Sequence, residues 1–480
     1  MIGVTSDKTQ NSFGRRVTQR LAALAFSVGL RLCQGVGLGA TLGLVAAPVR
    51  AEPLVLTHDG MVQTAVTLLE RGHPEQALRF ANALLQQNPE DATALIIKAR
   101  AERDLARYQS SVATARLAWK TAGLQRERYG AALAMAQGLA SDGQKFRAQF
   151  WLRRAIEEAP DEGAKRLAEK DFVYVKSRSR LGLKFDLAIQ PSSNVNNGSS
   201  SDVLWFMGLP FVLSEDAKAL SGVTTTLGIS GHYRLAETQT SKTDLRFSLG
   251  QRMVTLSGSA KATAPAARGS DYAFTTIEVG LDRYLRPGPK DEVQLGVTLG
   301  RNWYGGDPMS HYLGANALYR RDLTPTVRGF AEIGAERQWR EDVAERSADV
   351  MTLSFGLDTV TANRDRLRFE VTARDTASGS SDIDHRGWGA SLDWTRSKPV
   401  LKGRLSLGLS AEGRDYAVSK FSADGRHDLT VGATMSMAFE GADYMGFIPV
   451  LSVQSQRTSS NVSLYDSQST GIGLSVQSKF

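Results

Sequence analysis

From Leu181 to the end of the chain, apolar and polar residues alternate with a period of two, and no other feature constrains the fold as strongly. Between Val293 and Leu299, and again between Leu405 and Leu409, every second residue is apolar, while glycine or polar residues fall between them. Successive residues of a strand point to opposite sides of the sheet, so the pattern predicts strands with one apolar face. The runs suit tilted strands of ~9–11 residues, which can cross a bilayer.

About fourteen such segments can be counted, at roughly 181–190, 222–234, 241–254, 271–285, 291–303, 311–322, 326–339, 348–360, 365–375, 386–396, 400–414, 426–440, 444–456 and 468–480. Tight turns such as Pro287–Lys290 join every second pair, and longer loops such as 255–270 join the others. Short periplasmic turns and longer external loops are typical of outer-membrane barrels. A soluble β-sandwich does not predict this rhythm. We therefore expect an antiparallel transmembrane β-barrel over residues 179–480 in a Gram-negative outer membrane, with both barrel ends in the periplasm.

The last segment supports this prediction independently. Ile472, Leu474, Val476 and Ser478 share one face with Phe480, the final residue. A terminal aromatic on an amphipathic last strand resembles the signal that the β-barrel assembly machinery recognises, so we expect that machinery as a partner. Aromatic residues also lie near the ends of the predicted strands, where interfacial girdles form: Trp303, Tyr304, Tyr312, Tyr319, Trp339, Trp388 and Trp394.

Bulk composition excludes two other classes of protein. A mean hydropathy of −0.24 excludes a polytopic helical membrane protein. The net charge of +8 comes from dispersed basic residues that form no single run, so we expect no nucleic-acid partner. If the apolar faces point to lipid, the inward face is polar and of mixed charge. Its charged residues are Arg246, Glu332, Glu336, Arg368, Glu370, Asp393, Arg404 and Arg414. They either line a wet conduit or pair with one another and hold the barrel open.

Residues 52–178 have a different composition, and we expect them to form a periplasmic helical domain. Ala77, Phe80, Ala81 and Leu84 lie on one face at helical spacing. The spacing of glycine, small residues and proline between Gly72 and Pro89 fits a tetratricopeptide repeat and recurs between Gly143 and Pro160. Three units would give six helices, with a seventh over 161–175 as a cap. A generic helical bundle is the alternative. Basic residues could line a concave binding face or simply be solvated: Lys98, Arg100, Arg103 and Arg107.

The first 51 residues are predicted to be a secretory signal peptide. Arg15, Arg16 and Arg20 precede two apolar stretches, and Val49-Arg50-Ala51 fits a cleavage site after Ala51. The only cysteine, Cys33, follows Leu30-Arg31-Leu32, which does not suit a lipidated cysteine. Cleavage after Ala51 would leave a mature chain without cysteine, as suits the oxidising periplasm.

The first loop of the predicted barrel is unusual. It begins with Pro191 and contains Asn194 and Asn196, and the apolar run 204–213 follows. Asparagine and glycine are ordinary turn formers, so a plain loop is the alternative. The run contains Trp205, Phe206 and Phe211 and is costly to leave in water. We hypothesise that it folds inward or rests on the barrel rim as a gate.

The whole architecture resembles the surface lipoprotein assembly modifier family. The resemblance rests on a signal sequence, a tetratricopeptide domain, and a barrel that opens with Pro-Ser-Ser-Asn-Val-Asn at 191–196 and closes with Ser-Asn-Val-Ser-Leu-Tyr-Asp at 460–466. It implies a translocator that moves a specific lipoprotein, or a secreted haem- or iron-binding protein, across the outer membrane. It further implies that the helical domain assists in handling this client. We expect the chain to act as a monomer.

Chemistry-bearing motifs are sparse. The six histidines show no metal-ligand spacing, and the sequence has no zinc-protease, nucleophile-elbow or phosphate-loop motif. We therefore predict a non-enzyme and assign no catalytic, cofactor-binding or metal residues and no cofactor. His385, with Asp382 and Asp384 just before it, could form a weak acid–base or metal cluster, but a solvated loop is the simpler interpretation. The alternatives to protein export are a porin-like or exopolysaccharide export channel and, third, an outer-membrane enzyme.

Overall fold

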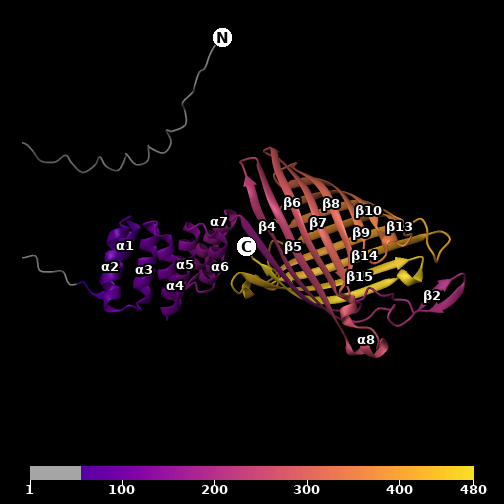
Figure 1. Cartoon of the computed structure of the whole chain (residues 1–480), viewed down its shortest axis with the longest axis horizontal. Coiled ribbons are helices and arrows are strands. Elements are labelled where there is room, and N and C mark those ends of the chain that lie inside the picture. The colour runs from indigo at the N-terminus through magenta and orange to yellow at the C-terminus, as the bar shows by residue number, and fades with distance from the viewer. Residues whose placement is uncertain (1–55, 480) are drawn as a thin grey trace, which may run out of the picture. The chain divides into compact units, whose positions relative to one another are not determined.

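The computed structural model describes residues 56–479. The predicted signal peptide, Cys33 and the terminal Phe480 lie outside these residues. The described part begins with helices and continues with strands (Figure 1). The helices are α1 (His58–Glu70), α2 (Pro74–Gln87), α3 (Ala92–Asp104), α4 (Tyr108–Thr121), α5 (Gln125–Ser141), α6 (Lys145–Glu157) and α7 (Glu162–Ser177).

Side-chain caps fix where several helices begin. The side chains of Thr57, Asp91 and Asp161 accept hydrogen bonds from the first-turn amides of α1, α3 and α7. Such caps satisfy backbone donors that have no partner inside the helix. None of the described helices is both long and apolar enough to cross a membrane.

The three helical hairpins α1–α2, α3–α4 and α5–α6 turn in the same way. Gly72, Ala106 and Gly143 occupy equivalent positions with φ of 77°, 60° and 81°. In each turn the next residue's amide donates to a carbonyl five residues earlier, as from His73 to Leu68 at 2.8 Å. Small side chains then let the paired helices approach, because Ala77, Ala81, Ala115 and Ala148 are fully buried. The recurrence of one turn agrees with the repeat period predicted from the sequence.

Fourteen antiparallel strands close into a barrel, as predicted. In chain order they are β1 (Leu181–Ser192), β4 (Gly222–Glu237), β5 (Ser241–Leu256), β6 (Phe274–Gly288), β7 (Asp291–Tyr304), β8 (Asp307–Asp322), β9 (Val327–Arg340), β10 (Ala348–Val360), β11 (Arg366–Ser378), β12 (His385–Thr395), β13 (Arg404–Tyr416), β14 (Arg426–Ala438), β15 (Phe447–Ser460) and β16 (Ser467–Ser478). Each strand pairs with its neighbours in sequence, and β1 closes the barrel against β16.

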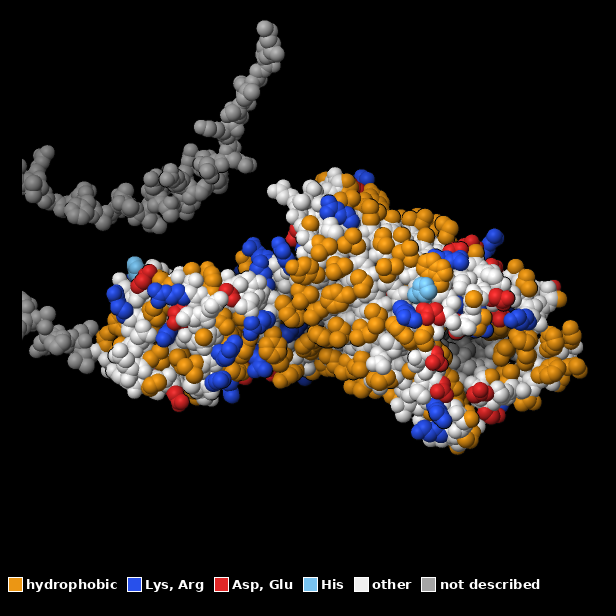
Figure 2. All heavy atoms as spheres, viewed as in Figure 1, with side chains coloured by type: hydrophobic (Ala, Val, Ile, Leu, Met, Phe, Trp, Pro, Cys, Tyr) orange, Lys and Arg blue, Asp and Glu red, His pale blue; other side chains and the backbone are white. Residues whose placement is uncertain are grey.

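The outer wall is apolar and the inside is polar, as the alternation predicts. Exposed Val297, Leu299, Leu353 and Phe355 point outward, and hydrophobic side chains cover the barrel on the face seen in Figure 2. Six of the eight predicted inward charges line cavities of roughly 480, 400 and 450 Å³. The lining residues include Arg246, Glu336, Arg368, Glu370, Asp393 and Arg414.

Several predicted boundaries were wrong by three or more residues, and three of them have local backbone reasons. The strand expected from 400 begins at Arg404, because Leu401 and Lys402 turn the chain with φ of 49° and 65°. The strand expected from 444 begins at Phe447, after a short 3₁₀ turn at Glu440–Ala442. The β7–β8 loop expected over 304–310 shrinks to Gly305 and Gly306, whose φ values of 63° and 97° permit a two-residue turn.

Two small elements add to the external side. The apolar run of the first loop forms a hairpin, β2 (Val203–Phe206) and β3 (Leu209–Val212). Met207 and Gly208 make its turn, with φ of 51° and 76°. A short helix, α8 (Gly258–Thr263), lies in the next external loop, which begins at Ser257.

Candidate functional site at the barrel seam

The structure brings the two end motifs together on the external side of the β1–β16 seam. Asn194 is 5% exposed, and its side-chain amide donates to the carbonyls of Gly198 at 2.9 Å and Gln468 at 3.3 Å. Its side-chain oxygen accepts from the Gly198 amide at 3.0 Å. Asn194 therefore shapes its own loop and ties that loop to β16. Pro191 lies in β1 opposite Val223 of β4.

Asn196 organises the return of the same loop toward β4. Its side-chain oxygen accepts from the Leu220 amide at 2.8 Å, and its nitrogen donates to the carbonyls of Lys218 and Asp216. A side chain at Gly198 would place Cβ 2.2 Å from the Lys218 carbonyl oxygen, so glycine is required there. The Lys218 ammonium donates to the Glu215 carboxylate and also to that of Asp202, which raises the pKa of Lys218 and keeps it charged.

The last loop completes this external clamp. The Ser199 hydroxyl donates to the Ser463 carbonyl at 3.0 Å, and the Ser463 hydroxyl donates to the Val203 carbonyl at 2.8 Å. The Ser200 amide donates to the carbonyl of Asp466 at 2.8 Å. Segments 191–203 and 460–468, which we call the external clamp, thus hold the two sides of the seam together.

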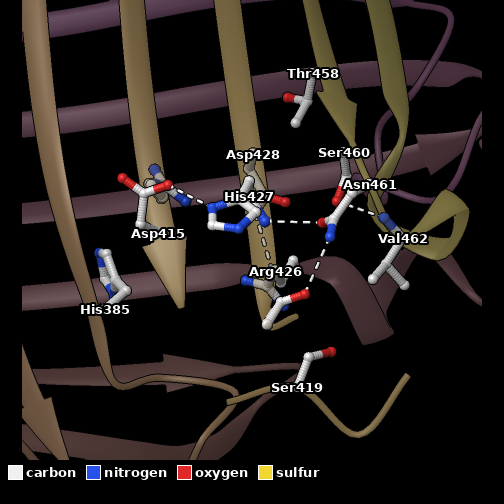
Figure 3. A network of polar contacts seen from close by, with 12 residues as sticks. His385, Asp415, Ser419, Arg426, His427, Asp428, Thr458, Ser460, Asn461 and Val462 are labelled. Carbon is white, nitrogen blue, oxygen red and sulfur yellow. Dashed lines mark hydrogen bonds and ion pairs between the residues drawn. The ribbon is translucent and has the colours of Figure 1, made fainter. Parts of the chain in front are cut away.

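A buried arginine supports the clamp from the neighbouring strands. The guanidinium of Arg426 lies between the rings of Tyr416 and Tyr465, 3.5 and 3.7 Å from their centroids. It also pairs with Asp428 at 3.1 Å. Figure 3 shows the adjacent His427 between Asp415 and Asn461. The imidazole lies 2.7 Å from the Asp415 carboxylate, and the His427 backbone amide donates to the Asn461 side chain at 2.8 Å.

The weak acid–base cluster considered at His385 is not assembled. The His385 ring contacts the Ile383 carbonyl at 2.7 Å and stacks on Tyr416. Asp382 pairs with Lys420, and Asp384 accepts from the Ser378 amide. Among residues 56–479, no group of three or more His, Cys, Asp or Glu residues could hold a metal.

Most side chains of the apolar hairpin β2–β3 are accessible, and Leu204 is buried. Trp205, Phe211 and Met207 are 60%, 49% and 85% exposed. An aromatic contact to another loop lies beside the turn of the hairpin, where Phe206 meets Phe421 edge-on at 6.1 Å. Hydrophobic side chains gather over this hairpin in Figure 2, and Figure 1 places β2 beyond the barrel strands. The hairpin thus rests on the rim rather than filling the lumen.

Sequence reasoning missed a second set of residues at the opposite end of the seam. Arg153 of α6 donates to the Met445 carbonyl at 2.8 Å and to the Ser478 hydroxyl at 2.9 Å. Lys165 and Glu169 of α7 pair with Asp443 and Lys479 at 3.1 and 3.0 Å. Charges on helices usually face solvent, and no spacing in the sequence marks these as partners of a distant turn. They could have been found only by knowing which barrel turn lies beside the last helices.

These observations define an outer-membrane β-barrel protein that carries a helical region before the barrel. Within this class, residues 265–480 match the family model described as surface lipoprotein assembly modifier. The match confirms the predicted resemblance over the barrel part and includes the motif at 460–466. The motif at 191–196 lies outside the matched residues.

The solved structures that match the chain include outer-membrane proteins and a secretion chaperone. The loop L8 deletion mutant of OmpT from Vibrio cholerae is 8% identical, with 62% of this chain and 99% of that chain covered and a TM-score of 0.33. Acinetobacter baumannii OccAB3 is 6% identical, with 61% and 98% covered and a TM-score of 0.33. The type III secretion translocator chaperone SycD of Yersinia enterocolitica is 13% identical, with 26% and 88% covered and a TM-score of 0.23. No curated protein matches the chain.

Proposed function

We propose that this chain is a translocator that exports a specific lipoprotein, or a secreted haem- or iron-binding protein, to the cell surface. The observation that carries the proposal is the family match over residues 265–480, whose closing motif forms half of the external clamp. The polar, charge-lined lumen supports it, because a polypeptide needs a wet path through the membrane. The protein acts without catalysis or a cofactor.

The helical residues 52–178 stand in the periplasm after removal of residues 1–51, and they receive the client there. Residues 179–480 form the path across the membrane. The β-barrel assembly machinery inserts the barrel by recognising its last strand and Phe480, and the chain works as a monomer.

The test is deletion of the gene followed by comparison of surface-exposed proteins. Loss of one or a few surface proteins, restored by the intact chain, is the expected result. Unchanged surface proteins together with lost uptake or release of a small solute or sugar polymer would instead support the channel alternative, which the same wet lumen permits.

The hairpin β2–β3 is proposed to gate the external mouth for the emerging client. Replacing residues 204–213 by a short Gly-Ser turn should leave the barrel folded, since β2 and β3 are not part of the barrel sheet and the bond from Ser463 to the Val203 carbonyl is kept. Export or conductance should change. If both stay unchanged, the hairpin is not a gate.

A further inference from the structure

The seam that closes the barrel is its least paired junction. β1 pairs with β4 at all twelve of its residues, Leu181–Ser192, whereas four residue pairs join β1 to β16. Every other junction of the described barrel has at least ten pairs. In hydrocarbon each unpaired backbone group is costly, so strand pairing determines where a barrel wall can part.

The register is interrupted at Gln190 and Pro191, and the other missing pairs lie at the end of the seam next to α7. Continuing the register from Leu187 and Val476 would set Asp186 of β1 opposite Gln477 of β16. No such pair forms, and residues 181–186 pair with β4 only among the described strands. The two strands therefore diverge at the periplasmic end. We call this divergence the split.

Helices α6 and α7 hold both sides of the split. Residues 178–180 join α7 covalently to β1. On the other side, Arg153 donates to Met445 and Ser478, and the Met445 amide donates to Glu157 at 2.9 Å. The Arg153 guanidinium also lies 4.3 Å from the ring centroid of Phe447, and burial lowers the pKa of Arg153 to about 10.

Two ion pairs extend this contact along α7. They join Lys165 to Asp443 and Glu169 to Lys479. We call this set of contacts, together with those of Arg153 and Glu157, the helical latch. A movement of α6 and α7 away from the turn at 440–446 would release β15 and β16 while β1 stays attached to the helices. The external clamp fixes the opposite end of the seam, so opening would begin at the periplasmic side.

A lipoprotein client poses a problem that this geometry addresses. Its polypeptide can pass through a polar lumen, but its acyl chains cannot, because exposing each CH₂ group to water costs ~0.8 kcal/mol. Arg246, Glu278 and Glu336 line the cavity of roughly 480 Å³ and make it unsuitable for acyl chains. The short peptide that links the two parts must therefore cross the barrel wall.

We propose that the split between β1 and β16 is a lateral entry site for the acylated N-terminus of the exported lipoprotein. The acyl chains stay in the bilayer, the adjoining peptide passes between the two strands, and the helical latch controls the opening. This inference rests on the proposed export function and adds to it the place where a membrane-anchored client enters.

The test compares two cysteine pairs that share one residue, in a Cys33→Ser background. Asp186→Cys with Gln477→Cys lies across the split. Asp186→Cys with Gly228→Cys lies across the intact β1–β4 junction, where a Cβ at 228 would be 3.3 Å from the Asp186 Cβ, close to disulfide geometry. Oxidation, or a short bifunctional thiol reagent where the sulfurs stand too far apart, closes each pair. The probe is the lipoprotein lost from the surface of the deletion strain.

Closing the split should reduce surface display of this lipoprotein to the level of the deletion strain, and reduction should restore it. Closing the β1–β4 control should leave display unchanged. A client variant without its lipidated cysteine should pass the closed barrel. Normal display with the split closed would overturn the proposal, as would equal loss of the lipidated and unlipidated clients. If the intact chain displays no lipoprotein at all, the proposed function itself fails, and the lateral entry site falls with it.

Discussion

At the scale of single residues, the external clamp depends on buried amides rather than on charge. Asn194 makes three hydrogen bonds from a nearly inaccessible position and joins two segments that are far apart in the sequence. A buried polar group that loses its partner costs more than the bond itself contributes, since the remaining partner is left desolvated. The sequence motif is therefore a structural requirement of the seam.

Asn194→Ala should destabilise the barrel by ~1–3 kcal/mol, because the carbonyl of Gly198 loses its donor and the tie to Gln468 is lost. The folded barrel and the unfolded chain migrate differently on a gel unless the sample is heated. The measurement is the urea concentration at which half of the folded band is lost. Ser200→Ala serves as the control, since its exposed side chain can be lost while the backbone bond to Asp466 is kept. A smaller effect for Asn194 than for Ser200 would contradict the proposed role.

The first helix should show a pH dependence of stability. Hydrogen bonds from His58 to Asp91, and then to Asp59, raise the pKa of His58 above its ordinary value near 6.5. The folded state therefore favours the protonated imidazole. The stabilisation is complete below the unfolded pKa and is lost as pH rises through the folded pKa.

We expect the helical circular-dichroism transition to shift to lower temperature as pH rises from about 6 to 8. The change is below ~1 kcal/mol, because His58 is half exposed and solvent screens the pair. His58→Gln should flatten the profile. If the melting temperature of His58→Gln falls with pH as steeply as that of the intact chain, other groups cause the pH dependence.

At the scale of elements, alternation predicted the strands well because the bilayer imposes an apolar face along each strand. What it could not predict were the points where the backbone leaves the sheet. In the sequence, Leu401 and Lys402 continue the apolar–polar alternation of a strand, yet they adopt a turn with positive φ. Hairpin β2–β3 is apolar on both faces, and alternation does not describe such a segment.

The orientation of the faces can be tested at two adjacent residues of β10. Leu353 points outward and is 41% exposed, whereas Thr352 lines the cavity of roughly 480 Å³. Leu353→Arg should destabilise the barrel by ~2–4 kcal/mol, since its charge would enter the middle of the hydrocarbon. Thr352→Arg should cost much less because its side chain meets water. Folding titrations into liposomes measure both, and a reversed order would invert the assignment of inside and outside.

At the scale of the whole molecule, the site could be predicted only in part. The motifs at 191–196 and 460–466 were singled out from the sequence, but their mutual contact was not, since nothing local shows that the first and last loops meet. The helical latch was not predicted at all. Lys165, Glu169 and Asp443 are ordinary charged residues until the tertiary structure brings them together.

Weakening the helical latch should make residues 178–180, which join α7 to β1, more accessible to a protease. Lys165→Ala with Glu169→Ala removes two ion pairs of ~0.2–1 kcal/mol each. Trypsin cleavage after Arg178 and Arg180 should then accelerate by about two- to thirtyfold, because cleavage follows the population of the open state. The control is Glu162→Ala with Arg166→Ala, a pair at 4.0 Å within α7 itself. Equal acceleration in both variants would show that the ion pairs to the barrel do not restrain the link.

The pairing of β1 with β16 also sets the order of events in assembly. Nearly all of the barrel sequence lies between these two strands, so bringing them together carries the largest loop-closure cost of any junction. We therefore expect ring closure to be the final step of folding. Until it happens, the chain presents two free strand edges that can capture other polypeptides. A nascent barrel that stalls before this step is an aggregation hazard, and its lifetime is a quantity on which quality control in the periplasm can act.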